Sequence, residues 1–325
     1  DREVAKAATD GLATFPGQEA DAAVMQMFAG ANADKQRLAL DLMGRRRMTS
    51  AMPVLIKAAG RDDTAIRTGA IRMIGDLGGS DQLPVVLDLL DGAKSPQDLA
   101  ALEQAMTAIC LKAADSEVYA GTLVGRLEKS QPAQKAAIVR VLGVIGGPAS
   151  LEAVCANAKS NNPDVRSAAV RALGTWKTTD AAPVLLAMAK ETSNASEKTL
   201  FLRGYLNLAG RGDLPVEDRL AMCRQASGLI ERDEEKRLLV STLGNVESPD
   251  AVASIAPYMD DAATRQEAVL AVVKVAEKLL GGEGPAPFAG RLVPSLEKAA
   301  QAASDEKLAA RVKAVLEKAR SKAAQ

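Results

Sequence analysis

Apolar residues recur three or four positions apart along most of the chain, which is the spacing of one side of an α-helix. The clearest example is the stretch 162–183, which reads as a turn, a helix, a second turn and the start of another helix. The apolar side of its first helix consists of Val165, Ala169, Val170 and Leu173. Pro163 and Asp164 are typical of a first turn, and Thr179 or Asp180 is expected to cap the next helix. One such helix cannot bury its apolar side alone, so the pattern predicts neighbours of the same kind.

Weaker copies of this unit predict a series of helix pairs. We expect them at Ala20–Ala29 with Lys35–Arg46, Ala51–Ala59 with Thr64–Leu77, Gln82–Leu90 with Asp98–Ala113, Glu117–Lys129 with Ala133–Ile145, Ala149–Lys159 with Asp164–Trp176, Ala181–Lys190 with Glu197–Leu208, Val216–Ile230 with Glu234–Leu243, Asp250–Met259 with Ala263–Leu280, and Phe288–Ala303 with Lys307–Arg320. Residues 1–16 match the second half of the unit, so we expect a half repeat or capping helix there and a native protein that continues upstream. Residues 17–325 are expected to form a single repeat domain, with the final pair at 287–320.

Two residue types recur at fixed positions in the unit. Gly44 and Gly75 lie 31 residues apart, and so do Gly143 and Gly174. Prolines follow three of these glycines after nine residues, at Pro53, Pro84 and Pro183. Glycine inside a helix costs about 1 kcal/mol relative to alanine, so its recurrence predicts a contact that leaves no room for a Cβ atom. The prolines are expected in first turns, whereas Pro257 lies deeper and is expected to bend or restart its helix. The longest interruptions, 91–97 and 281–290, are expected to be extended loops.

The run PDVRSAAVRALG followed by DAAPVLL resembles a HEAT repeat, and more closely the short HEAT-like repeats of the phycobilin-lyase type. The resemblance covers about residues 20–320. It implies an all-α fold, a right-handed α-solenoid (armadillo-type) of about nine helix pairs, with first helices on the convex face and second helices on the concave face. Deoxyhypusine hydroxylase resembles the chain in its repeats but needs His and Glu iron ligands. HEAT-like DNA glycosylases are similar in fold but strongly basic, and the balanced charge of this chain argues against that activity.

Composition removes several classes of function. The 41 basic and 41 acidic residues cancel, whereas nucleic-acid-binding domains usually have a basic excess, so we do not expect a nucleic-acid partner. The chain has no histidine, which excludes His-based metal sites, the Ser-His-Asp and Cys-His catalytic systems, and the hydroxylase activity above. Three cysteines, Cys110, Cys155 and Cys223, stand far apart in apolar stretches and are expected to be buried and to form no disulfide or metal site.

Basic residues recur eight positions before the glycine position or its equivalents, which are Cys110, Leu206 and Val273 where glycine is missing. We call this set the basic ladder: Arg67, Lys135, Arg166, Lys198, Lys236 and Arg265. Acidic residues precede it in the interhelical turns, chiefly Asp63, Asp164 and Asp261. We expect the two sets to join adjacent repeats and to cap second helices. A row of anion-binding sites is the alternative, and the neighbouring carboxylates argue against it.

A second basic set lies three positions before the glycine position. We call it the arginine stripe: Arg72, Arg140, Arg171 and, by alignment to Leu206, Arg203. It has no acidic residue at a fixed offset and is expected to project from the second helices toward the concave face. It is either a solvated polar face or a partner-binding surface, because arginine favours forked contacts with carboxylate or phosphate.

Other conspicuous residues are expected to be structural. The run 45–47, three arginines, suits the negative end of a helix, and Trp176 is expected to pack between repeats. Glu103 and the pair Glu234–Glu235 read as isolated carboxylates on polar faces, so no general acid–base pair is predicted.

The sequence therefore predicts a non-catalytic protein–protein interaction scaffold that binds a protein partner on its concave face. The alternatives are a HEAT spacer or docking segment of a larger multidomain enzyme, and a lyase-like or cofactor-handling HEAT protein. We expect no cofactor, no metal and a monomer. No apolar run is long enough to span a membrane, so we expect a soluble protein of the bacterial cytoplasm, or one exported after removal of a leader.

Overall fold

The computed structural model describes residues 2–30, 32–282, 284 and 286–324. Over these residues the regular structure is entirely helical, with 19 α-helices, five short 3₁₀ helices and no strand. The chain divides into two compact units, Asp1–Ala172 and Leu173–Gln325, which are considered separately below. The all-α prediction is thereby confirmed.

The helices of unit 1 are α1 (Arg2–Thr14), α2 (Gln18–Ala29), α3 (Ala33–Arg45), α4 (Met52–Ala58), α5 (Thr64–Leu77), α6 (Leu83–Asp91), α7 (Pro96–Cys110), α8 (Ala120–Leu127), α9 (Pro132–Ile145), α10 (Pro148–Asn157) and α11 (Pro163–Gly174), which contains the boundary. Those of unit 2 are α12 (Ala182–Glu191), α13 (Ala195–Ala209), α14 (Val216–Ser227), α15 (Asp233–Leu243), α16 (Pro249–Ile255), α17 (Arg265–Leu280), α18 (Ala289–Ala302) and α19 (Glu306–Ala323). The 3₁₀ helices are η1 (Thr49–Ala51), η2 (Ser80–Gln82), η3 (Ser116–Tyr119), η4 (Thr179–Ala181) and η5 (Ala256–Met259).

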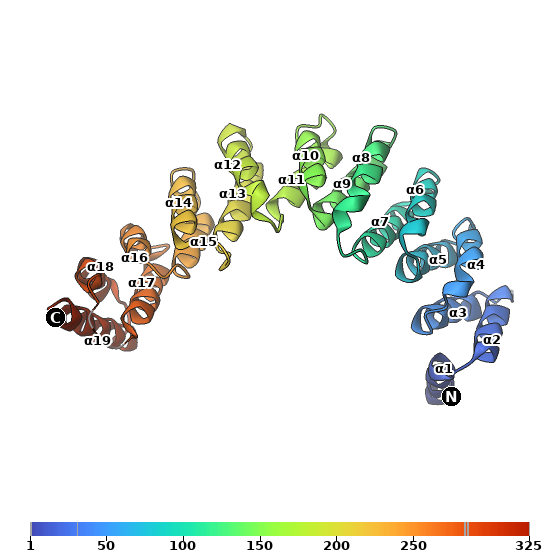
Figure 1. The fold of residues 1–325 in the computed structure, drawn as a ribbon, viewed down its shortest axis with the longest axis horizontal. Coiled ribbons are helices and arrows are strands. Elements are labelled where there is room, and N and C mark those ends of the chain that lie inside the picture. The colour runs from blue at the N-terminus through green and yellow to red at the C-terminus, as the bar shows by residue number, and fades with distance from the viewer. Residues whose placement is uncertain (1, 31, 283, 285, 325) are drawn as a thin grey trace. The chain divides into compact units, whose positions relative to one another are not determined.

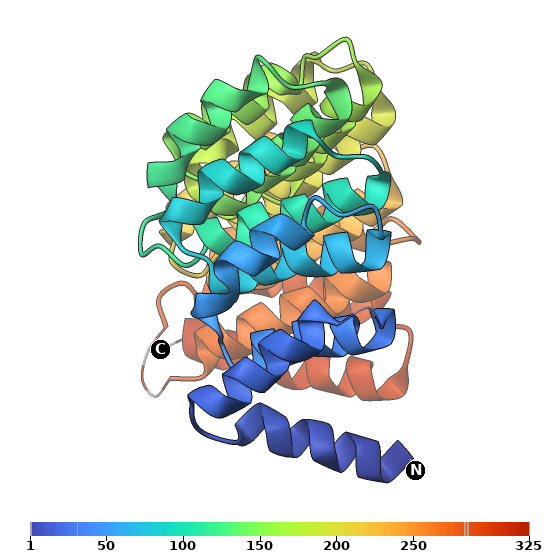
Figure 2. The same ribbon diagram turned by 90° about the vertical axis from the view of Figure 1, so that its right-hand side faces the viewer.

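Within each unit the helices form two layers. In unit 1 the second helices α3, α5, α7 and α9 pack one against the next, each also against the first helix of its pair (Figure 1). In unit 2 the second helices α13, α15, α17 and α19 pack in the same way. Figure 2, turned by 90°, shows the helices of unit 1 after α1 (blue to green) lying one behind another with similar axis directions. Helix α1 packs against α3, in the place of a second helix.

The helix positions expected from the sequence agree with the structure to within three residues when η1–η4 are counted with the helix after them and η5 is counted with α16, the helix before it. Pro53, Pro84 and Pro183 lie in first turns as predicted. The prediction for Pro257 is also confirmed, because α16 ends at Ile255 and Pro257 lies in η5.

Three local predictions were wrong. Thr179 and Asp180 lie inside η4, which has no side-chain cap, and Asp180 instead accepts a hydrogen bond of 3.3 Å from the buried indole of Trp176. The interruption at 91–97 is short, since α6 continues to Asp91 and α7 begins at Pro96 with Ser95 as its cap. Cys155 is only half-buried, unlike the other two cysteines. In the connection 281–288, Glu283 and Pro285 lie outside the described residues.

The recurring glycines are points of close contact between successive second helices. A Cβ atom on Gly75 would lie 2.5 Å from the Cα atom of Ala105, and one on Gly143 would lie 2.5 Å from the Cβ atom of Ala172. A Cβ atom on Gly174 would lie 3.1 Å from the carbonyl oxygen of Leu200. These distances confirm that the glycine position leaves no room for a side chain.

Candidate interaction surfaces

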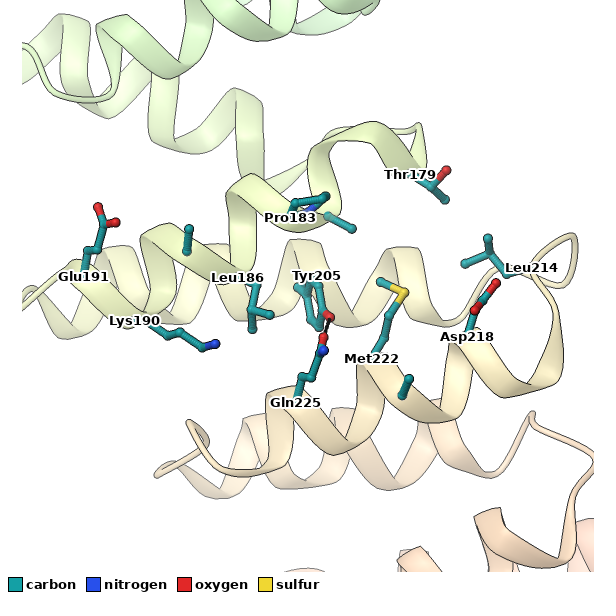
Figure 3. A pocket seen from close by; sticks show the side chains of 13 residues that line it. Thr179, Pro183, Leu186, Lys190, Glu191, Tyr205, Leu214, Asp218, Met222 and Gln225 are labelled. Carbon is teal, nitrogen blue, oxygen red and sulfur yellow. Dashed lines mark hydrogen bonds between the residues drawn. The ribbon is translucent and has the colours of Figure 1, made fainter.

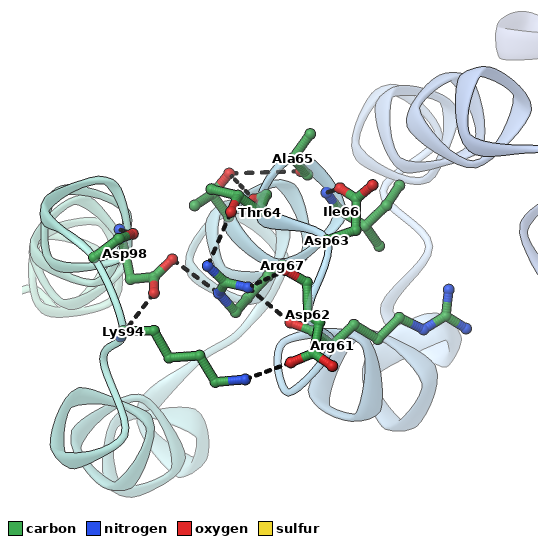
Figure 4. Close-up of polar contacts among 11 residues, drawn as sticks. Arg61, Asp62, Asp63, Thr64, Ala65, Ile66, Arg67, Lys94 and Asp98 are labelled. Carbon is green, nitrogen blue, oxygen red and sulfur yellow. Dashed lines mark hydrogen bonds and ion pairs between the residues drawn. The ribbon is translucent and has the colours of Figure 1, made fainter.

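A buried polar contact of unit 1 involves the ladder residue Arg67 (Figure 4). Its Nε donates to Oδ1 of Asp98 at 2.9 Å, and its Nη1 donates to the carbonyl oxygens of residues 61 and 62, both at 2.8 Å. The side chains of Arg67 and Asp98 are only 6% and 2% exposed. The pair joins α5 to α7 and fixes the turn before α5.

The charge state of Asp98 follows from its neighbours. Burial raises the pKa of its carboxyl, but the hydrogen bonds from Arg67 and the Lys94 amide, with the Arg67 charge, outweigh burial and hold the pKa below its ordinary value. Asp98 comes from the next repeat, so the carboxylate of this pair is not the expected Asp63. Asp63 instead caps α5 by accepting from the Ile66 amide at 2.9 Å.

The other ladder residues differ from one another in their contacts. Lys236 pairs with Asp261 of the next repeat at 2.7 Å, and Lys198 pairs with Glu231. Arg265 donates to the carbonyl oxygen of Met259 at 3.0 Å. Lys135 is half-buried and Arg166 is exposed. Asp164 is exposed and is not the cap of α11, since Asn162 accepts the hydrogen bond from the Val165 amide.

A further set of basic residues, not predicted from the sequence, binds the carboxyl ends of preceding helices. Lys112 lies just beyond the end of α7. Its Nζ donates to the carbonyl oxygens of Gly75, Asp76 and Gly78, at the end of α5, at 2.6–2.7 Å. Arg46 and Lys322 make equivalent contacts at the ends of α1 and α17. The run 45–47 thus ends α3 as expected, but its Arg46 stabilises the preceding second helix and not its own.

The arginine stripe is exposed in the structure, with Arg72, Arg140 and Arg171 on α5, α9 and α11 of unit 1 and Arg203 on α13 of unit 2. Arg140 Nη2 lies 2.7 Å from Oε2 of Glu103 on α7, so Glu103 is not an isolated carboxylate. Arg72 Nε donates to the side-chain amide oxygen of Gln104 at 3.2 Å. The sequence missed both contacts because they join neighbouring repeats.

Glu235 also departs from the sequence-based interpretation. It is 3% exposed and accepts a hydrogen bond of 2.6 Å from Oγ1 of Thr199 on α13. It is therefore a buried link between α13 and α15, and not a carboxylate on a polar face.

A groove of about 430 Å³ runs across the second helices α7, α9 and α11 of unit 1. We call it the second-helix groove. It is lined by Pro96, Leu99, Ala100, Glu103, Ala133, Ala136, Arg140, Asp164, Ser167, Ala168 and Arg171. It brings together two stripe arginines, two carboxylates and a floor of small residues.

The part of the chain that the structure describes holds no group of three Cys, Asp or Glu side chains arranged as metal ligands. None of the described helices combines the length and apolar character needed to cross a lipid bilayer.

Comparison with known proteins identifies the repeats. A family model described as HEAT repeats matches residues 20–107 and 121–201, more than half of the chain. The chain belongs to the HEAT-repeat family. The two layers of paired helices are thus those of a HEAT-repeat α-solenoid, as the resemblance implied. No curated protein matches the chain.

Solved structures with similar folds include a chain of a Kap95p–RanGDP complex, at 11% identity and a TM-score of 0.56, covering 95% of this chain and 46% of that one. An engineered protein matches at 17% identity and a TM-score of 0.46, covering 98% and 96%. The CpcE–CpcF phycocyanin lyase complex of Nostoc sp. matches at 15% identity and a TM-score of 0.36, covering 90% and 92%. Only the first superposition exceeds a TM-score of 0.5, and at its low identity it shows the fold alone.

Proposed function

We propose that this HEAT-repeat chain is a monomeric, non-catalytic scaffold that binds a protein partner on the face of its second helices. The observation that carries the proposal is the second-helix groove, in which Arg140 and Arg171 stand over a floor of alanines. The family supports the proposal at a general level, since HEAT arrays typically present extended surfaces to partners.

The chemistry of the groove favours a polypeptide with a carboxylate. Glu103 holds the guanidinium of Arg140 in one orientation, which lowers the entropy that the arginine loses when a partner binds. The small side chains of Ala100, Ala133 and Ala168 let a partner approach the helices closely. A partner side chain can reach these arginines with the forked hydrogen bonds that arginine forms with carboxylates.

A capture experiment tests the proposal. The full chain with Arg72→Glu, Arg140→Glu and Arg171→Glu is compared with the unchanged chain by quantitative mass spectrometry of proteins retained from an extract of the source organism. The control carries Lys57→Glu, Lys129→Glu and Lys159→Glu, which change the same charge at exposed positions on or just after first helices. We expect the stripe variant alone to lose the retained partner, and equal retention by all three proteins would overturn the proposal.

A further inference from the structure

A hollow of unit 2 lies between two of its first helices. It has a volume of about 690 Å³ and separates α12 from α14. We call it the first-helix groove. It is lined by Thr179, Ala182, Pro183, Leu186, Ala187, Lys190, Glu191, Tyr205, Leu214, Asp218, Ala221, Met222 and Gln225 (Figure 3).

We propose that the first-helix groove is a second docking site, which takes a short amphipathic helix of a partner protein. The bound helix presents two apolar side chains between an acidic residue at the Lys190 end and a basic residue at the Asp218 end. This site is independent of the arginine stripe, and the inference does not rest on the function proposed above.

The groove is held open by contacts on its inner side. Arg219 of α14 is 6% exposed and donates to the carbonyl oxygens of Ala209, at the end of α13, and Asn245, after α15, at 3.1 and 3.0 Å. These bonds fix α14 to the second helices, so its position does not depend on contact with α12. A preformed groove lowers the free energy that binding must supply.

The middle of the groove is apolar with one polar contact. Tyr205 of α13 is 2% exposed and forms the floor, and its hydroxyl donates to Oε1 of Gln225 at 2.6 Å (Figure 3). Leu186 and Met222 face each other across this floor and are half-buried. Methionine adapts its shape to an apolar partner at little cost, so the centre suits two apolar side chains.

The two ends carry opposite charges. Lys190 extends toward Gln225 at one end and Asp218 lies beside Leu214 at the other, while Glu191 points away from Leu186 and Tyr205 (Figure 3). Neither Lys190 nor Asp218 forms an ion pair with a described residue. Unpaired opposite charges at the two ends set the direction of a bound helix.

The groove is long enough for about two turns of a bound helix. Its lining positions on α12 run from residue 182 to residue 191, a distance of about 13.5 Å at the helical rise. In a helix of that length, positions i, i+3, i+4 and i+7 lie on one side. An acidic residue at one end, two apolar residues in the centre and a basic residue at the other therefore reach the groove together.

A displayed library of random peptides of about 15 residues, the length at which isolated helices begin to form, tests the proposal against the full chain. We expect selected peptides to carry the acidic, paired apolar and basic pattern with helical spacing. Ala187→Arg with Ala221→Arg, at exposed positions inside the groove, should weaken their binding by about tenfold or more, measured by fluorescence polarisation. Ala253→Arg, exposed on α16 outside the groove, and Arg140→Glu should leave it unchanged.

A charge exchange supplies a second measurement that does not fill the groove. Lys190→Glu with Asp218→Lys should select peptides whose acidic and basic residues are reversed in order. The proposal is overturned if no peptide binds the full chain, if selected peptides bind the Ala187→Arg, Ala221→Arg protein as well as the unchanged chain, or if the charge exchange leaves peptide order unchanged.

Discussion

At the residue scale, the ion pair between Arg67 and Asp98 sets the relative position of α5 and α7. Removing one partner of a buried pair leaves the other charge without compensation, and such a loss typically amounts to about 3–5 kcal/mol. We therefore expect Asp98→Ala to lower the free energy of unfolding of unit 1 by that amount, measured by urea denaturation. The control Asp62→Ala removes only the exposed partner of Lys94 and should change little.

The same pair makes a prediction about pH. The pKa of Asp98 is lower in the folded chain than its ordinary value of 3.8, so the stability it contributes is fully present above pH 3.8. That contribution is lost as the pH falls through the lowered folded-state pKa. The difference in unfolding free energy between the unchanged chain and Asp98→Ala should be constant from pH 7 to pH 5 and should shrink below pH 3.8. A difference that grows on acidification would contradict the role assigned to Asp98.

The glycine contacts give a matched pair of substitutions. Gly75→Ala places a methyl group 2.5 Å from the backbone of Ala105, which cannot move aside without separating α5 from α7. Overpacking of this kind costs about 1–3 kcal/mol. Gly125→Ala, inside α8 with nothing within 4 Å of the new atom, should stabilise by about 0.5–1 kcal/mol because alanine favours the helix. Thermal unfolding of both variants decides the matter, and equal shifts would contradict the close-contact account.

At the scale of the helices, basic residues that bind the end of the preceding second helix help to hold the layers together. Lys112 satisfies three carbonyl oxygens that α5 and its following turn leave without partners. Lys112→Met keeps the apolar stem but removes the three hydrogen bonds, so amide exchange should quicken at the carboxyl end of α5. Hydrogen exchange read by mass spectrometry checks this, and Lys57→Met on α4 is the control. Unaltered exchange in α5 would mean that water satisfies the three carbonyl oxygens as well as Lys112 does, and it would contradict the stabilising role of Lys112.

The sequence predicted the helices well because their signals are local. Apolar spacing, first-turn prolines and close-packed glycines each act within one or two turns. The contacts between repeats were harder to predict, because the number of residues between the two partners of an ion pair varies. Arg67 reaches Asp98 over 31 residues, Lys198 reaches Glu231 over 33, and Lys236 reaches Asp261 over 25. No fixed offset identifies such partners, which is why Glu103 and Glu235 were misinterpreted.

The candidate sites were predictable only in part for the same reason. Arg140 and Arg171 were selected from their repeat position, but the carboxylates and alanines around them come from three different helices. The first-helix groove has no local signal, because it depends on how Arg219 places α14 against α13 and α15.

At the scale of the whole molecule, the central claim is that the chain works by binding a protein on its second-helix face. Repeats of one kind build the fold, and the side chains that differ between repeats supply the specificity. The second-helix groove combines Arg140, which Glu103 holds in place, and Arg171 with a small-residue floor, and this combination is what the claim rests on.

The most direct test is hydrogen exchange on the full chain with and without the partner retained in the capture experiment. The account predicts that the bound partner slows amide exchange in α7, α9 and α11 of unit 1, because it suppresses local opening of these helices. The substitutions Arg140→Glu and Arg171→Glu should abolish this slowing. Slowed exchange confined to first helices, with those three helices unaffected, would contradict it.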